Sequence, residues 1–451
     1  MMNNSQGQGP RANQASAGGA KTKQTRANST QATTSISKAS PTQSPEQDAP
    51  GVELVTPQDI GELVAWLQGL DPGVKIRAQG LGTNHLESLD DRVIVNTQGF
   101  DRIEHRVEDF SVSVGAGVAW DQLQTRLAST HQRIAIDGPE PGTVGAMVAT
   151  GARGGLIHRW GPMRDQIIGM TVVLADGTVA HSGGTVIKNV AGYDLAKLFT
   201  NARGRYGIIT EVVFRTHPLP PTERTLVVAL ANGDASDRSV AIGEVHEIVT
   251  KLRGSMVALS AMDLAGGLLF SRIEGDQTVM ESRVTRLQAS LGTNKEVTVL
   301  DHDESLAHWR ALTASQSPVV GSVVVGITAR SSHLVSILDE IGRDCGVILG
   351  DVVHLGAGVA EVTLSGAGLS EQLEPMRSRL EYAGAGMELR ARNGVMTALA
   401  SDRFCVDPNP LALADTTALH RYHQQRQGTT SGPSALVQAI AQVLDPDGRF
   451  S

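Results

Sequence analysis

Three glycine-rich stretches hold the residue types most suited to binding chemistry in this sequence. They are RAQGLGTNH (77–85), DGPEPGTVGAMVATGARGG (137–155) and GGTVIKNVAGYDLAKLF (183–199). Glycine lets the backbone turn tightly and approach a ligand, so that successive N–H groups can point at an anion such as a pyrophosphate. Together the three loops could enclose a dinucleotide, whose pyrophosphate, ribityl chain and ring each need hydrogen-bond donors.

The first two stretches differ in how specific their signals are. Gly80 and Gly82 follow a strand, but no third glycine opens a helix and no βαβ unit frames them, so they are not a Rossmann fingerprint. Taken alone, the first stretch is better interpreted as a structural turn. The second stretch packs its glycines among small residues, although each glycine loses more conformational entropy on folding than alanine. Close backbone approach to an extended, flat ligand would explain that cost.

The elements that must position these loops alternate between short strands and helices. Residues 52–70 predict a strand, a turn at Thr56-Pro57 and a helix, because the apolar residues from Ile60 to Leu67 have helical spacing. A Pro-rich hinge, THPLPPTE (216–223), predicts a domain boundary. Further strands are predicted within 74–85, 91–100, 110–120, 208–216, 225–231 and 255–264, and further helices at 120–130, 239–252, 277–291 and 434–445.

The chain of 451 residues is therefore expected to form two α+β domains after a tail. Residues 1–48 contain almost no large apolar side chain and predict a disordered tail, with an organellar transit peptide as the weaker alternative because no amphipathic helical pattern is present. Residues 49–220 are expected to form the first domain. Residues 221–451 are expected to form a second α+β domain with a C-terminal helix.

The composition of the chain indicates which partners it is not expected to bind and in which compartment it is expected. A net charge of -8 disfavours binding to nucleic acid or to anionic lipid. Cys345 and Cys405 alone can build neither a disulfide framework nor a cysteine-ligated iron-sulfur cluster, so another chain must carry any such cluster. The sequence contains no run of eighteen apolar residues and no signal-peptide core, so we expect a cytoplasmic protein without a membrane span, associated with membranes only peripherally through partners.

In order, these motifs resemble the FAD-binding domain of the vanillyl-alcohol-oxidase/PCMH-type superfamily. The resemblance covers residues 52–220 and extends loosely to 400, as a cap domain. It also includes VSVGAGVAWDQL (112–123), DQIIGMTVVLADGTV (165–179) and GRYGIITEVVF (204–214). VIKNVAGYDLAKLF (186–199) most resembles the FAD-binding subunits of bacterial glycolate oxidases. Two positions depart from the family pattern: Ala146 stands where glycine is usual, and Arg205-Tyr206 where Thr-Leu is usual.

The resemblance implies which residues hold the cofactor. The backbone of 78–83 would hold the pyrophosphate of FAD, residues of 139–146 would line the flavin, and Gly151 and Gly155 would lie against the ribityl and adenosine part. No histidine lies inside the first loop, since His85 lies past it, so FAD is expected to be noncovalent. The residues expected to bind FAD are Arg77, Ala78, Gln79, Gly80, Leu81, Gly82, Thr83, Asn84, Pro139, Thr143, Val144, Gly145, Ala146, Gly151, Gly155, Lys188, Asp194, Ile208 and Ile209.

Several of these residues also have a simpler interpretation. Asp194 could pair with Lys188 at the flavin or could cap the helix that follows it. Arg153, His158 and Arg159 could receive a carboxylate through charge-assisted hydrogen bonds, although a solvated face is the better interpretation. His354 is expected to be a strand residue rather than a metal ligand, and no metal site and no catalytic residue is predicted. Trp309 is expected in the core.

Three functions remain open at this point. The resemblance implies a FAD-dependent oxidoreductase acting on a CH–OH group, working with a second flavoprotein subunit and an iron-sulfur subunit to oxidise a 2-hydroxy acid such as glycolate. A self-contained FAD-dependent dehydrogenase would need its own acid–base residues in 221–400, and none stands out there. A non-catalytic assembly subunit is the third possibility, which the two departures from the family pattern keep open.

Overall fold

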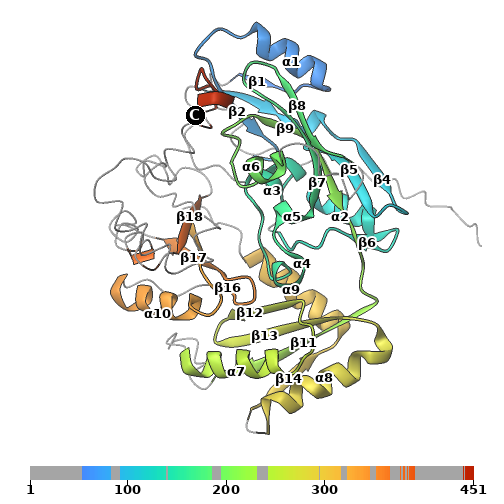
Figure 1. The fold of residues 1–451 in the computed structure, drawn as a ribbon, viewed down its shortest axis with the longest axis vertical. Coiled ribbons are helices and arrows are strands. Elements are labelled where there is room, and N and C mark those ends of the chain that lie inside the picture. The colour runs from blue at the N-terminus through green and yellow to red at the C-terminus, as the bar shows by residue number, and fades with distance from the viewer. Residues whose placement is uncertain are drawn as a thin grey trace, which may run out of the picture. The chain divides into compact units, whose positions relative to one another are not determined.

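A computed structural model describes most of the chain from residue 53 onward (Figure 1). The described residues are 53–82, 92–138, 141–184, 194–230, 242–293, 295–315, 322–345, 352–365, 376, 379, 380, 383, 385–391, 440 and 442–450. The predicted tail and the segment 392–439, which includes the first residues of the helix predicted at 434–445, lie outside them. Among the described residues, no helix has the length and apolar character needed to cross a membrane.

A three-stranded parallel sheet begins the fold. Its order is β1 (Leu54–Val55), β3 (Arg92–Asn96) and β2 (Lys75–Gln79). Helix α1 (Ile60–Gly69) begins after Asp59, whose side chain accepts a hydrogen bond from the amide of Glu62 at 2.9 Å. Leu63 and Leu67 of this helix are fully buried in one cluster with Phe450 at the other end of the chain. The spacing that predicts the helix therefore also identifies its buried face.

A five-stranded antiparallel sheet follows in the same part of the chain. Its order is β4 (Ile103–Arg106), β5 (Ser111–Gly115), β9 (Ile208–Arg215), β7 (Ile167–Val173) and β8 (Val179–Gly183). Val112 and Val114 alternate with serines along β5 and enter the core, as the period-two pattern requires. The short helices beside it are α2 (Trp120–Ala128), α3 (Val144–Ala149), α4 (Ile157–Trp160), α5 (Met163–Gln166) and α6 (Leu195–Phe199).

The predicted Pro-rich hinge is paired rather than free. His217 and Pro218 form β10 (His217–Pro218), which pairs antiparallel with β6 (Gln132–Arg133). Thr222 then opens β11 (Thr222–Ala229), so the last residues of the segment already belong to the next sheet. The hinge segment is thus held by backbone hydrogen bonds to β6 on one side and to the eight-stranded sheet on the other.

An eight-stranded antiparallel sheet contains most of the remaining chain. Its order is β14 (Val297–Leu300), β11, β13 (Leu268–Gly275), β12 (Ala261–Ala265), β16 (Val352–His354), β17 (Val359–Ser365), β15 (Ser322–Thr328) and β18 (Gly386–Ala391). Apolar residues of α7 (Ile242–Gly254), α8 (Gln277–Leu291) and α10 (Leu334–Cys345) share one core with one face of this sheet. Helix α9 (His302–Ser315) packs on the other face through Trp309, which is buried as predicted (Figure 1).

The two faces of the eight-stranded sheet differ in chemistry. Along β11 and β13 the apolar side chains point to the core shared with α7 and α8. The opposite face carries apolar residues near Trp309, and toward the end of β13 it carries Glu223, Arg272 and Glu274, all buried. Buried charges on a sheet face need partners, and two of these partners, Arg133 and Asp137, come from the segment that begins at β6. The mixed α+β fold predicted from the sequence is confirmed.

Candidate functional site

The loop after β2 and the start of α3 lie in direct contact. A Cβ atom added at Gly80 would overlap Oγ1 of Thr143 and would lie 2.7 Å from its Cγ2 atom. Gly82 adopts a φ of 69°, in the left-handed region that glycine tolerates. The first and second glycine-rich stretches therefore meet, as the sequence predicts for loops that share one ligand.

The start of α3 is fixed by hydrogen bonds to neighbouring loops. Thr143 is fully buried, and its Oγ1 accepts from the amide of Ala146 at 3.3 Å. The amides of Val144 and Gly145 donate to the carbonyls of Val118 and Ala116, each at 2.8 Å. These three amides are committed inside the protein, so this helix start can line a ligand but has little free donor capacity for a phosphate.

The beginning of β9 joins the same region. The amide of Ala116 donates to the carbonyl of Thr210 at 2.9 Å, which ties the end of β5 to β9. Ile208 and Ile209 are buried, and their backbones pair with Val173 and Val172 of β7. Four segments therefore lie next to one another: residues 79–82, 115–119, 143–146 and 208–210.

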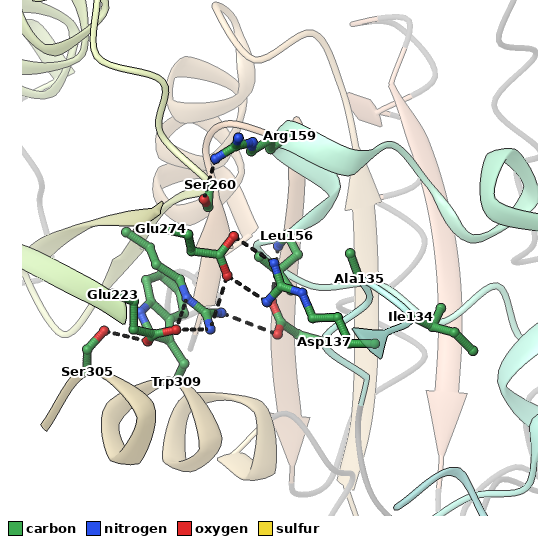
Figure 2. Close-up of polar contacts among 12 residues, drawn as sticks. Ile134, Ala135, Asp137, Leu156, Arg159, Glu223, Ser260, Glu274, Ser305 and Trp309 are labelled. Atoms are coloured by element: carbon green, nitrogen blue, oxygen red, sulfur yellow. Dashed lines mark hydrogen bonds and ion pairs between the residues drawn. The ribbon is translucent and has the colours of Figure 1, made fainter. Parts of the chain in front are cut away.

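A buried network of charges lies on the polar face of the eight-stranded sheet (Figure 2). Arg133 binds both oxygens of Glu274 through its two terminal nitrogens, at 2.6 and 2.7 Å. Arg272 donates to Oε2 of Glu223 at 2.6 Å and lies 3.5 Å from an oxygen of Asp137 and from one of Glu274. Two guanidinium groups therefore face three carboxylates. We call these five residues the charge network: Arg133, Asp137, Glu223, Arg272 and Glu274.

Neutral side chains complete the charge network on the side of α9. The hydroxyl of Ser305 donates to Oε1 of Glu223 at 2.7 Å, and Trp309 donates its indole N–H to Thr225 at 2.8 Å. The guanidinium carbon of Arg272 lies 5.5 Å from the centre of the Trp309 ring, within range of a cation–π interaction. Figure 2 shows Ser305 and Trp309 on one helix, directed at the sheet.

Burial and charge set the protonation of the charge network. Burial alone would raise the pKa of Glu274, but the hydrogen bond and charge of Arg133 outweigh it and lower that pKa to about 2. Burial also raises the pKa of Asp137, and the charge of Arg272 offsets this only in part. Burial works against the charged form of Arg272, but its three carboxylates raise its pKa above the ordinary value. The charge network holds one more carboxylate than it has guanidinium groups, and Asp137 is the carboxylate whose pKa rises.

Comparison with known proteins decides what the first part of the chain is. Residues 52–183 match the family model described as FAD binding domain. This chain carries an FAD-binding domain. The matched range includes the loop after β2, helix α3, and two residues of the charge network, Arg133 and Asp137.

Curated relatives match over part of this chain and over part of their own length. D-lactate dehydrogenase [cytochrome], mitochondrial, of Arabidopsis thaliana is 37% identical over 140 residues, 30% of this chain and 24% of that protein. Glycolate oxidase subunit GlcD of Bacillus subtilis (strain 168) is 39% identical over 98 residues, 22% of this chain and 21% of that protein. The matches thus span about a quarter of these two relatives.

A solved structure extends the similarity to the fold as a whole. An alkyldihydroxyacetonephosphate synthase structure matches with a TM-score of 0.60 at 13% identity, over 88% of this chain and 75% of that chain. At this identity the likeness shows the fold alone. The fold is that of a PCMH-type FAD-binding domain followed by a cap domain, as the sequence predicts.

The structure tests whether the predicted cofactor residues suit FAD. Gln79 ends β2 with a buried Oε1 that has no hydrogen-bond partner among the described residues, beside the contact between Gly80 and Thr143. An unsatisfied buried polar atom next to a glycine turn fits a missing polar ligand. The residues at this place therefore fit FAD, with the loop after β2 and the start of α3 on either side.

The other predicted cofactor residues lie in several places. Arg77 and Ala78 belong to β2, and Leu81 lies between the two glycines of its loop. Gly151 has a φ of 59° and lies against Asn201, whereas Gly155 lies against Ala261 and Asp263 of β12. The atoms nearest to an added Cβ at Gly151 or Gly155 thus differ from those at Gly80, which belong to Thr143. Thr83, Asn84, Pro139 and Lys188, together with His85, lie outside the described residues.

Asp194 and Tyr206 have structural roles. Asp194 caps α6, where its side chain accepts from the amide of Lys197 at 3.3 Å, and it forms an ion pair with the same lysine at 3.2 Å. This is the capping role that the sequence left open. Tyr206 is buried in the core, edge-on to Phe199 with ring centres 6.1 Å apart, so its bulk fills the core.

Arg153 and Arg159, for which the sequence favoured a solvated face, each lie near a hydroxyl group of the second part of the chain. Arg153 lies 3.3 Å from the hydroxyl of Thr328, and Arg159 lies 3.4 Å from that of Ser260. His354 is a strand residue, as predicted. Its Nδ1 lies 2.7 Å from Asp263, whose charge outweighs the effect of burial and raises the pKa of His354.

Sequence reasoning missed the charge network as a functional feature. Glu223, Arg272 and Glu274 alternate with apolar residues in strands, a pattern that normally indicates a solvent-facing surface. The available signal was the charge alternation itself in TERTLVVA and LLFSRIEG, but nothing local indicates that this face is covered.

Proposed function

We propose that this chain is the FAD-binding subunit of a glycolate-oxidase-type complex. The reaction removes two electrons and two protons from the CH–OH group of a 2-hydroxy acid and yields the 2-oxo acid, so that glycolate gives glyoxylate. Bound FAD supplies the two-electron redox chemistry. The observation that carries the proposal is the FAD-binding domain, whose relatives are named as D-lactate dehydrogenases and as a glycolate oxidase subunit.

The chain's own residues would hold and enclose the cofactor. The loop 79–82 would hold the pyrophosphate with its backbone, since its glycines allow close approach. The start of α3, from Thr143 to Ala146, would line the flavin as a rigid wall, because its amides are already hydrogen-bonded inside the protein. Ile208 and Ile209 would support this wall from β9.

The partners in this proposal follow from what the chain holds. Two cysteines, Cys345 and Cys405, cannot ligate an iron-sulfur cluster, which uses four protein ligands. Among the described residues, no group of three or more potential ligands could hold a metal ion. We therefore propose an iron-sulfur subunit and a second flavoprotein subunit as partners, in the cytoplasm.

The cofactor is expected to be noncovalent FAD. The first glycine-rich loop contains no histidine at 77–83 to which a flavin could be attached. Acid precipitation of the purified protein should leave a colourless pellet and a yellow supernatant, measured by absorbance. Colour retained in the pellet would show a covalent bond, and a protein that takes up no added FAD would contradict the cofactor assignment.

The complex is tested by purifying a tagged chain from its native host. We expect an iron-sulfur protein and a second flavoprotein to co-purify, and we expect dye-linked glycolate oxidation by the complex to exceed that of the isolated chain by at least about tenfold. Vigorous turnover by the isolated chain, without partners, would instead identify a self-contained dehydrogenase. A complex that turns over equally without this chain would identify an assembly subunit.

A further inference from the structure

The segment that would line the flavin is a loop closed at its base by one side chain. We call residues 138–155 the cofactor loop, of which the structure describes all but 139 and 140. Just before it, Oδ2 of Asp137 accepts a hydrogen bond at 3.1 Å from the amide of Leu156, just after it. A Cβ atom added at Gly154 would overlap the carbonyl oxygen of Asp137, so the two ends touch. Asp137 therefore fixes where the cofactor loop starts and where it ends.

The base of the cofactor loop is attached to the eight-stranded sheet by charges. Arg272 of β13 lies 3.5 Å from Oδ1 of Asp137. Glu274, two residues along β13, holds Arg133 by both carboxylate oxygens. Arg133 and Asp137 lie on the same short segment before the loop, so β13 holds this segment at two points. Two charge-assisted contacts fix both position and orientation better than one.

The contact between the cofactor loop and β13 is rigid, because the side chains on β13 are themselves held in place. The side chains of Arg272, Glu223 and Glu274 are at most 6% exposed. Glu223 bonds both Arg272 and Ser305, which leaves Arg272 little freedom to follow a moving loop. In such a buried site, loss of one charge leaves its partner without compensation, and the partner must move toward water or another group.

We propose that Arg272 and Glu274 of β13 are positioning residues for the cofactor. Through Asp137 and Arg133 they set the place of the cofactor loop, and with it the place of Thr143 and Gly145 at its centre. The eight-stranded sheet thereby contributes to cofactor binding through the charge network. This inference rests on the proposed placement of FAD against the start of α3.

The test compares the same substitution at two buried carboxylates. Glu274→Gln removes the charge that holds Arg133. Glu244→Gln is the matched control, because Glu244 is also largely buried and pairs with Lys295, and neither of these two residues belongs to the charge network. For each variant the dissociation constant for FAD is measured with the apo full-length chain. Amide hydrogen exchange in peptides covering 141–156 is measured without FAD.

We expect Glu274→Gln to weaken FAD binding by about tenfold and to speed hydrogen exchange in 141–156. Glu244→Gln should lower the thermal midpoint yet leave both quantities at their wild-type values. Equal effects of the two substitutions, or wild-type exchange in Glu274→Gln, would overturn the positioning role. A wild-type chain that takes up no FAD would instead overturn the proposed function, and the cofactor role with it. Failure to oxidise glycolate bears on the proposed function alone, since neither readout uses turnover.

Discussion

Replacing Arg272 with methionine is expected to lower the free energy of unfolding by about 3–5 kcal/mol, the range for breaking a buried ion pair by removing one partner. Methionine keeps most of the packing against Trp309 but removes the cation between three carboxylates. Glu274 retains Arg133, whereas Glu223 and Asp137 lose their nearest positive charge. The measurement is urea unfolding followed by tryptophan fluorescence and circular dichroism.

The matched control is Arg102→Met. Arg102 also pairs with a glutamate, at 2.9 Å, but its side chain is 79% exposed. Exposed pairs contribute about 0–1 kcal/mol, so this variant should unfold close to the wild type. Adding Glu223→Gln to Arg272→Met should recover part of the loss, because the uncompensated carboxylate is removed as well. Equal stability of the two arginine variants would show that solvent reaches the charge network.

Gly80→Ala is expected to weaken FAD binding by at least about tenfold while the protein stays folded. The added methyl group would overlap Oγ1 of Thr143, which is fully buried and already bonded to the amide of Ala146. Since Thr143 cannot rotate away freely, the loop after β2 must move away from α3. The two walls proposed to hold the cofactor would then separate. The measurement is an FAD titration of the apo protein, with circular dichroism to check folding.

Gly69→Ala provides the comparison for this prediction. Gly69 ends α1, and an added Cβ atom there meets nothing within 4 Å. This variant should bind FAD like the wild type. In the Gly80→Ala protein, Thr143→Ala removes the two nearest clashing atoms and should restore part of the affinity relative to Gly80→Ala alone. Wild-type affinity in Gly80→Ala would mean that the loop after β2 does not contribute to the cofactor site.

The glycine-rich stretches show what the sequence could predict: that other atoms lie close to the backbone there, but not which atoms these are. Their density predicts close backbone approach, and the structure shows such approach at Gly80, Gly145 and Gly154. The neighbours are protein atoms, however: a Cβ atom at Gly145 would lie 2.9 Å from that of Ala116. A valine at Gly145 would therefore strain the contact with the end of β5 as well as affect a ligand. Glycine density predicts that other atoms lie close to the backbone, and only the fold shows that these are atoms of the protein itself.

Local patterns in the sequence by themselves determined elements such as α1, which the spacing of Leu63 and Leu67 predicts, because helical periodicity depends on residues close together along the chain. The FAD-binding domain was implied instead by the resemblance of the ordered glycine-rich motifs to a known family. Lys188 and Asn84 remain predictions, because they lie outside the described residues.

Only the tertiary structure decided which charges are buried and which pairs they form. Arg133 and Glu274 are 141 residues apart, and their contact depends on how the segment after β6 lies on the polar face of β13. The same glutamate at a solvent-facing strand position would be unremarkable, because water would solvate it as well as an arginine does. Burial makes the pairing obligatory, and burial of this face is a property of the packed elements and not of the sequence around any one residue.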